Sequence, residues 1–177
     1  IRDRTGNVAK LVVHENKVLG TGEVDGVSLI SKPRENGISA ELLVEAGIKV
    51  SNPVHLCFGI LPEEGLQDIS MLVNIGDGAE VSVIAHCVFP NALKVIHKMD
   101  AVINIGKNAS FSYRETHFHG NFGGIEVIPR VKVTLGEKAV YQNTFSLVEG
   151  CVGKLDFDYD VISGAKSLAE LTAKEGK

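Results

Sequence analysis

The chain has 177 residues, of which 44% are hydrophobic and 23% are charged, and its formal net charge is −4. This composition is typical of one folded domain with a sizeable core. The acidic balance excludes a basic stripe of the kind that neutralises nucleic-acid phosphates, and no apolar run approaches the roughly 18–20 residues of a membrane-spanning helix.

We therefore expect no nucleic-acid partner and no membrane partner. The chain starts at Ile1 without the pattern of a signal peptide and stops abruptly at Lys177, so we expect a fragment of a longer protein. Its three cysteines, Cys57, Cys87 and Cys151, form no CxxC pair. An odd number of cysteines without such spacing argues against a disulfide framework and predicts a reducing, cytoplasmic setting.

The chain is expected to form a single domain over residues 1–177. Residues 1–40 are predicted to form N-terminal strands and turns, and residues 41–165 are predicted to form the repeated body of the domain. Residues 166–177 are expected to form a helix or a linker, because only the stretch KSLAELTAK, residues 166–174, has the composition of a helix.

A repeat of 30 residues runs through the body of the chain. The stretches LVNIGDGAEVSV, VINIGKNASFSY and KVTLGEKAVYQN begin at Leu72, Val102 and Lys132. Aligned columns hold the glycines Gly76, Gly106 and Gly136 and the alanines Ala79, Ala109 and Ala139. A fainter fourth copy places Gly164 28 residues after Gly136. Periods of this size are typical of stacked structural units.

Each copy reads as strand, tight turn and strand, because β-forming residues alternate on both sides of a G-x-x-A turn. Glycine is expected to supply the unusual backbone angles of the turn, and Asn74 and Asn104 are expected to stack in an amide ladder. The constant period predicts an all-β protein, a parallel β-helix with rungs of about 30 residues and few helices. An antiparallel sandwich or jelly roll is the alternative, because regular strand spacing alone also fits it.

In a β-helix, residues one period apart lie on neighbouring rungs, about 4.8 Å apart. Cys87 and His117 differ by 30, so we expect the sulfur and an imidazole nitrogen within about 4–7 Å, where an imidazolium would lower the pKa of the thiol. His86 would point to the opposite face of its strand. Cys87 is therefore a candidate reactive thiol, and a small buried hydrophobic residue is the alternative.

His117 and His119 form an H-x-H pair, and on a strand both side chains face one way, as metal ligands do. A cupin-like metal enzyme would use such a pair, although Glu126 fits the place of its further ligand poorly. His55 and Cys57 also share one face of a strand, and we expect both of them in the core.

Several stretches resemble the SufB/SufD family, the scaffold subunits of iron–sulfur cluster assembly. They are GIKVSNPVHLCF from Gly47, AHCVFP from Ala85, IHKMDAVINIGKNASFSYRETHFHG from Ile96 and FGGIEV from Phe122. Each motif is short, but their order and spacing agree with the family from Gly47 to Leu147.

The resemblance implies a right-handed parallel β-helix that works with an ABC-type ATPase, SufC, and receives sulfur from a cysteine desulfurase. Cys87 falls where SufB carries its sulfur-handling cysteine, and His97 falls on the histidine after the following loop. His117 and His119 take the places of a glutamine and a tryptophan that line a polar path inside the family's β-helix. Further candidates for sulfur handling are Arg130, which with Lys132 would line this path, and His55 and Cys57.

We therefore expect a scaffold for iron–sulfur cluster assembly and not an enzyme. Cys87 would carry persulfide sulfur or a transient iron–sulfur cluster, and His97, His117 and His119 would assist it. The implied partners are a SufC-like ATPase, a homologous SufB/SufD subunit or a second copy of the chain, and a cysteine desulfurase system. The alternatives are the cupin-like enzyme, which antiparallel strands would favour, and a purely structural solenoid.

Overall fold

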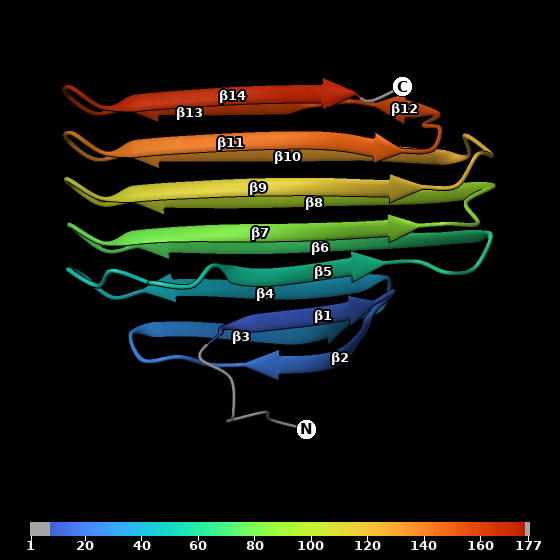
Figure 1. Ribbon diagram of the computed structural model, residues 1–177, viewed down its shortest axis with the longest axis horizontal. Coiled ribbons are helices and arrows are strands. Elements are labelled where there is room, and N and C mark those ends of the chain that lie inside the picture. The colour runs from blue at the N-terminus through green and yellow to red at the C-terminus, as the bar shows by residue number, and fades with distance from the viewer. Residues whose placement is uncertain (1–7, 176–177) are drawn as a thin grey trace.

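Every regular element among the described residues, 8–175, is a β-strand in the computed structural model of the protein (Figure 1). The strands in chain order are β1 (Lys10–His14), β2 (Lys17–Gly22), β3 (Val27–Arg34), β4 (Gly37–Val44), β5 (Val54–Gly59), β6 (Glu64–Ile75), β7 (Glu80–Phe89), β8 (Lys94–Ile105), β9 (Ser110–His119), β10 (Ile125–Leu135), β11 (Val140–Glu149), β12 (Lys154–Leu155), β13 (Asp158–Ser163) and β14 (Leu168–Glu175). Residues 8–175 therefore include no helix long and apolar enough to cross a membrane.

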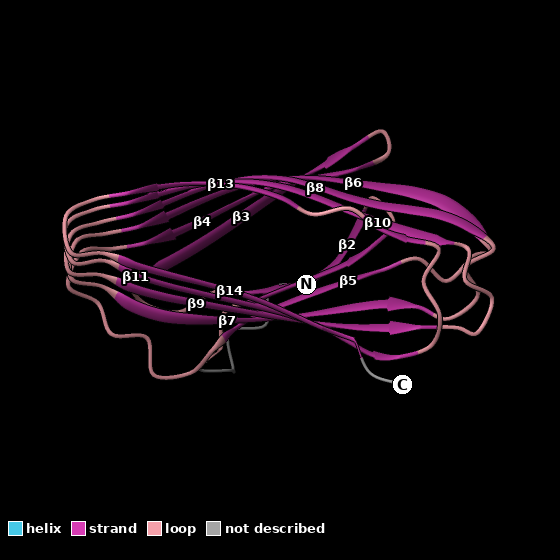
Figure 2. Cartoon of the chain, turned by 90° about the horizontal axis from the view of Figure 1, so that it is seen from above, coloured by secondary structure: helices cyan, strands magenta, loops and turns pink. Residues whose placement is uncertain are grey.

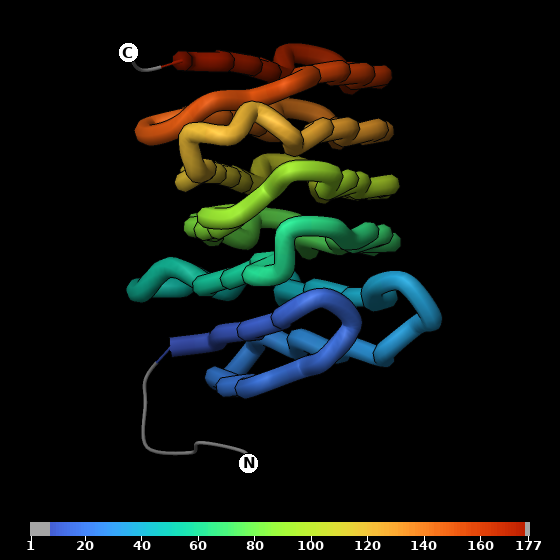
Figure 3. Tube along the Cα trace, turned by 90° about the vertical axis from the view of Figure 1, so that its right-hand side faces the viewer, coloured from blue at the N-terminus to red at the C-terminus, as the bar shows by residue number. Residues whose placement is uncertain are grey.

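The strands form two sheets that face each other across the core (Figure 2). One sheet has the order β14-β11-β9-β7-β5-β1-β2, and the other has the order β12-β10-β8-β6-β4-β3, with β13 also pairing with β10. From β4 to β11 the chain alternates between the sheets, so that β6 with β7 makes one rung and β8 with β9 makes the next. Figure 3 shows these rungs stacked from the N-terminal to the C-terminal end.

The stack is a parallel β-helix with rungs of about 30 residues, as the repeat predicts, and its coil is right-handed, as the family resemblance implies. From β4 onward, the rear strands in Figure 1 run to the left, the front strands run to the right and the chain rises, which gives a right-handed coil. Leu72 pairs with Val102 and Val102 pairs with Lys132, both in parallel strands, so the register follows the 30-residue repeat. The antiparallel sandwich is thereby excluded, and with it the barrel topology on which the cupin-like alternative depends.

The core forms between the two sheets because apolar and polar residues alternate along each strand. In β8, Val95, His97 and Met99 are buried, whereas Ile96 and Val102 lie on the exposed face. The same alternation continues in β7 and β9, whose inward residues include Cys87 and the histidines discussed below. Any polar residue at an inward position is therefore placed in a dry interior.

The repeated glycines have a different purpose from the one that the sequence predicts. A Cβ atom on Gly106 would lie 2.6 Å from the nitrogen of Asp77, in the preceding turn. The left-handed backbone falls two residues later, at Gly78, Asn108 and Lys138, with φ of 68°, 55° and 56°. The expectation that the repeated glycine supplies unusual angles is therefore wrong, because this glycine is needed for the close approach of stacked turns.

Replacing Gly106 with alanine should lower the free energy of unfolding by about 2 kcal/mol, since the added methyl group overpacks the stacked turns. Thermal or urea denaturation followed by circular dichroism measures this loss. Gly20→Ala is the matched control, because a Cβ atom at Gly20 would meet nothing within 4 Å. An equal effect of the two substitutions would contradict the packing argument.

The outer surface carries the predicted amide ladder. Asn104 Nδ2 donates to Asn74 Oδ1 over 2.9 Å, between neighbouring rungs. This contact joins β6 and β8 outside the core, so the ladder reinforces the register without occupying interior space.

The N-terminal end of the stack is paired differently from its body, and the C-terminal end differs from the sequence prediction. At the N-terminal end, β1 pairs with β2 and β3 pairs with β4 in antiparallel fashion. At the other end, the helix expected over residues 166–174 is wrong, because β14 is a strand that pairs in parallel with β11. The edge of β11 outweighs local helix propensity there, which is only a weak preference.

Candidate functional site

Four ligand-type side chains converge inside the stack, between the two sheets. Cys87 comes from β7, His97 from β8, and Glu115 and His117 come from β9. One ligand atom of each lies within 4.8 Å of the ligand atoms of the other three. All four residues are buried, so the group lies away from solvent.

Cys87 lies at the centre of this group. Its Sγ is 3.5 Å from Glu115 Oε1 and 3.8 Å from His97 Nε2. Cys87 pairs with His117 in the parallel register of β7 and β9, so both point into the same interior. The predicted proximity of the sulfur and an imidazole nitrogen of His117 is confirmed, since these atoms lie within 4.8 Å.

A chain of hydrogen bonds continues along the inward face of β9. Glu115 Oε1 is 2.5 Å from His117 Nε2, and His117 Nδ1 is 3.0 Å from His119 Nε2. The predicted H-x-H pair therefore shares one face, but its two rings contact each other. Only His117 belongs to the group of four, and His119 supports it from behind.

His97 is held in a similar way from the other sheet. Gln67, on the preceding rung of β6, places its Oε1 3.0 Å from His97 Nδ1. Gln67 Nε2 donates to the carbonyl oxygen of Glu15 over 2.9 Å, which orients the amide so that its oxygen faces the ring. His97 Nδ1 therefore carries the proton, and the lone pair of Nε2 faces the Cys87 sulfur.

Aromatic rings enclose the polar group and keep it dry. The Phe89 ring lies 5.0 Å from the His97 ring and 5.9 Å from the His117 ring, measured between centroids. The Phe145 ring lies 4.7 Å from the His117 ring. These contacts restrict the imidazoles, so the lone pairs and protons of the group keep defined directions.

Burial shapes the protonation of the site. It lowers the pKa of His97 to about 3, with the neighbouring His117 adding to the effect. It also lowers the pKa of His119 to about 4, again with a contribution from His117. For Glu115, burial is the largest influence and favours the neutral acid, but the hydrogen bonds from His117 and Cys87 and the charges of His117 and His97 together leave its pKa below the ordinary value.

The same environment raises the pKa of the Cys87 thiol, whereas we expected a lowered pKa. Burial, and then the charge of Glu115 together with its hydrogen bond, raise the pKa of Cys87 well above the ordinary value. The prediction that His117 increases the thiolate fraction is therefore wrong for the metal-free protein. His117 is already hydrogen-bonded to the Glu115 carboxylate, which also faces the sulfur, and the 30-residue spacing does not reveal this contact.

Three of the other predicted residues, His55, Cys57 and His86, lie on the outer face of the sheet that contains β5, β7 and β9. His55 and Cys57 alternate with the buried Leu56 and Phe58 in β5, so the prediction that they lie in the core is wrong. His86 points away from Cys87, as predicted, and its ring stacks on that of His55 with centroids 6.4 Å apart. The stacked rings of His55 and His86 therefore lie on the opposite face of the sheet from the buried group.

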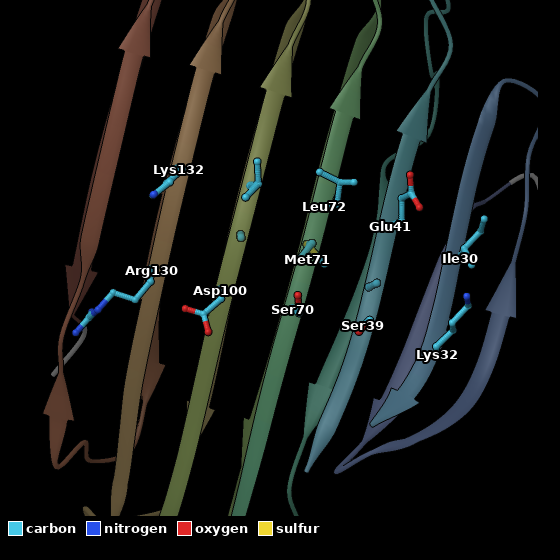
Figure 4. A pocket seen from close by; sticks show the side chains of 13 residues that line it. Ile30, Lys32, Ser39, Glu41, Ser70, Met71, Leu72, Asp100, Arg130 and Lys132 are labelled. Carbon is cyan, nitrogen blue, oxygen red and sulfur yellow. The ribbon is translucent and has the colours of Figure 1, made fainter. Parts of the chain in front are cut away.

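Arg130 and Lys132 do not line an interior path. They lie on the outer face of β10, at one end of a shallow groove of about 610 Å³ that crosses the second sheet (Figure 4). Arg130 Nη1 donates to the carbonyl oxygen of Asp156 over 2.7 Å, and its Nη2 is 3.0 Å from the Asp156 carboxylate. The inward positions beside them belong to Pro129 and Val131, because alternation in β10 sends the charged residues outward.

Sequence reasoning missed Glu115 and Gln67. Both had a detectable signal. Glu115 stands two residues before His117 and therefore shares its inward face. Gln67 stands 30 residues before His97, one period of the repeat, and the two residues pair in the register of β6 and β8.

Comparison with protein-family models found no match, and no solved structure matched the chain at a significant level. The chain is 34% identical over 169 residues to an iron–sulfur cluster assembly SufBD family protein of Methanocaldococcus jannaschii, a match that covers 96% of the chain and 54% of the relative. It is 30% identical over 167 residues to a protein of the same family from Pyrococcus horikoshii, covering 94% of the chain and 51% of the relative. The chain thus spans about half the length of these curated relatives, and by this similarity it belongs to the SufBD family.

Proposed function

We propose that this chain is part of a scaffold on which iron–sulfur clusters are assembled, and that Cys87 receives the sulfur. The names of the two curated relatives support a role in iron–sulfur cluster assembly. One observation supports the residue assignment above the others. Cys87 lies between two proton acceptors, with Glu115 Oε1 at 3.5 Å and His97 Nε2 at 3.8 Å from its sulfur.

Sulfur would reach Cys87 by persulfide exchange, the sulfur analogue of thiol–disulfide exchange. The Cys87 sulfur attacks the terminal sulfur of a donor persulfide, and a new S–S bond forms between them. The S–S bond of the donor breaks, and its electron pair stays on the donor sulfur. The donor leaves as a thiol after taking up the proton that Cys87 gives up, so the exchange needs no oxidant or reductant.

The proton acceptors matter because the thiolate is the nucleophile, whereas burial and Glu115 raise the pKa of Cys87. A thiol in this environment needs a base in contact with it to react. Glu115 is the better placed base, since its carboxylate is ionised and the pKa of His97 is lowered to about 3. The product persulfide would then remain among His97, His117 and His119.

Cys87 is fully buried, so a donor has no access to it in the closed stack. We propose that a SufC-like ABC-type ATPase drives the opening, and that the chain itself is a scaffold and not an enzyme. A cysteine desulfurase system would supply the sulfur. A homologous SufB/SufD subunit or a second copy of the chain would complete the assembly, which would release a transient iron–sulfur cluster.

The test is sulfur labelling of the full-length protein. Incubation with a cysteine desulfurase and isotopically labelled cysteine should add sulfur to the peptide that contains Cys87, detected by mass spectrometry without reductant. Cys87→Ser should lose this label. Cys151→Ser is the matched control, because Cys151 is exposed and outside the site, and it should keep the label on Cys87.

Two results would contradict the proposal. Label confined to Cys57 or Cys151 would place the acceptor elsewhere. Equal labelling of the wild-type protein and the Cys87→Ser variant would show that Cys87 takes no part.

A further inference from the structure

We propose that Cys87, His97, Glu115 and His117 form a mononuclear binding site for a divalent first-row transition metal of the Fe²⁺ or Zn²⁺ type. The site shares Cys87 with the sulfur-acceptor role. Only the assignment of iron as the biological ion rests on that proposed function, whereas the site itself follows from the four side chains.

The geometry suits a tetrahedral ion. Metal–sulfur distances of about 2.3 Å and metal–nitrogen or metal–oxygen distances of about 2.0–2.1 Å imply ligand–ligand separations of roughly 3.4–3.6 Å. The Cys87 sulfur is 3.5 Å from Glu115 Oε1 and 3.8 Å from His97 Nε2. The ion would replace the hydrogen bond between Glu115 Oε1 and His117 Nε2. These two atoms, now 2.5 Å apart, would move further apart to coordinate it.

Both imidazoles present the correct nitrogen to this point. The Nδ1 atom of His97 faces Gln67, and the Nδ1 atom of His117 faces His119, with both distances 3.0 Å. The Nε2 atoms of His97 and His117 are therefore the ones that join the group of four. A polar partner behind each ligating histidine is the arrangement that fixes ring orientation in metal sites.

The charges also agree with a divalent ion. A Cys87 thiolate and the Glu115 carboxylate would together neutralise a 2+ ion, and two neutral histidines would complete the shell. The described residues, 8–175, bury no lysine or arginine that could serve as a fixed counter-ion for Glu115. An ion would supply this charge in a dry interior, where an uncompensated charge is costly.

The donor set also narrows the type of metal. A thiolate and two imidazoles favour Zn²⁺, Fe²⁺ or Co²⁺, whereas Mg²⁺ and Ca²⁺ prefer oxygen ligands. Co²⁺ is therefore a suitable spectroscopic probe. The outer group of His55, Cys57 and His86 offers an internal comparison, because it also holds two histidines and one cysteine, on the opposite face of the sheet.

The experiment is an anaerobic titration of metal-free full-length protein with Co²⁺. We expect one Co²⁺ per chain, with the intense visible bands of a tetrahedral ion and a thiolate-to-cobalt charge-transfer band. Cys87→Ser should lose the charge-transfer band, and Glu115→Gln should weaken binding at least tenfold. Gln67→Leu should weaken binding about 10–100-fold, as expected for an orienting partner, whereas His86→Gln should leave it unchanged.

X-ray absorption of the Zn²⁺-loaded wild-type protein keeps the test independent of variant folding. One sulfur at about 2.3 Å and three nitrogen or oxygen ligands at about 2.0–2.1 Å are expected. Failure to bind one ion, an octahedral spectrum, or binding that survives Cys87→Ser would each overturn the site. Sulfur labelling of Cys87 without metal binding would overturn this inference alone, and metal binding without labelling would overturn only the sulfur-acceptor role.

Discussion

Replacing Glu115 with alanine is expected to lower the free energy of unfolding by about 3–5 kcal/mol, because a buried hydrogen-bond donor loses its acceptor and a cavity forms in the core. The carboxylate accepts a hydrogen bond from His117 Nε2 and lies 3.5 Å from the Cys87 sulfur. Its loss leaves a buried imidazole N–H without an acceptor and opens a cavity between the sheets. Urea denaturation of the metal-free protein measures the difference.

Two further variants separate the carboxylate from its surroundings. Glu115→Gln keeps an oxygen that can accept from His117, so it should cost less than the alanine variant. Glu126→Ala removes an exposed carboxylate from the outer face of β10, and such surface changes usually stay within about 0.5 kcal/mol. If Glu115→Ala were no worse than Glu126→Ala, the buried network would not contribute to stability.

The metal-free protein should lose stability steeply as the pH falls below about 6.5. The pKa of His97 is about 3 in the folded chain and 6.5 in the unfolded chain, so between these values only the unfolded chain binds the proton. Each such proton lowers the free energy of unfolding by about 1.4 kcal/mol per pH unit. His97 alone therefore accounts for a loss of about 3 kcal/mol by pH 4.5.

His119 and Glu115 act in the same direction, because folding lowers the pKa of both. The contribution of Glu115 is present above its unfolded pKa and is lost as the pH falls through the folded value. Urea denaturation at a series of pH values, with a chelator present, measures the slope. His97→Gln should reduce it by about 1.4 kcal/mol per pH unit between pH 4.5 and 6.

A matched core variant without a titrating group serves as the control for this slope. Ile69 is fully buried, and Ile69→Val should cost about 1 kcal/mol equally at every pH. A wild-type stability that is constant from pH 6.5 to 4.5 would show that His97 is not held in its neutral form.

The sequence predicts the fold and part of the site because the repeat carries register information. A constant 30-residue interval places Cys87 beside His117, since parallel strands stack residues one period apart. The same interval relates Gln67 to His97. Wherever both residues fall inside the repeated region, counting along the chain is enough to identify neighbours.

Prediction fails where the interval changes or where side-chain chemistry decides. The register from β5 to β7 pairs Phe58 with Cys87, one residue short of the full period, so His55 and Cys57 face outward instead of inward. The protonation of Cys87 depends on which way the Glu115 carboxylate turns. A repeat predicts which face of a strand a residue lies on, but it does not predict the hydrogen-bond partners of the side chain.

The stacking of each rung on its immediate neighbours also has a consequence for folding. In the body of the stack, each strand from β6 to β11 pairs in parallel with strands about one period away, so this part of the chain can order as a one-dimensional zipper in which each docked rung templates the next. Cys87 and Gln67 come from one rung, and His97, Glu115 and His117 come from the next. The chemistry of this protein is thus encoded in two successive rungs, and the site is complete as soon as the second has docked on the first.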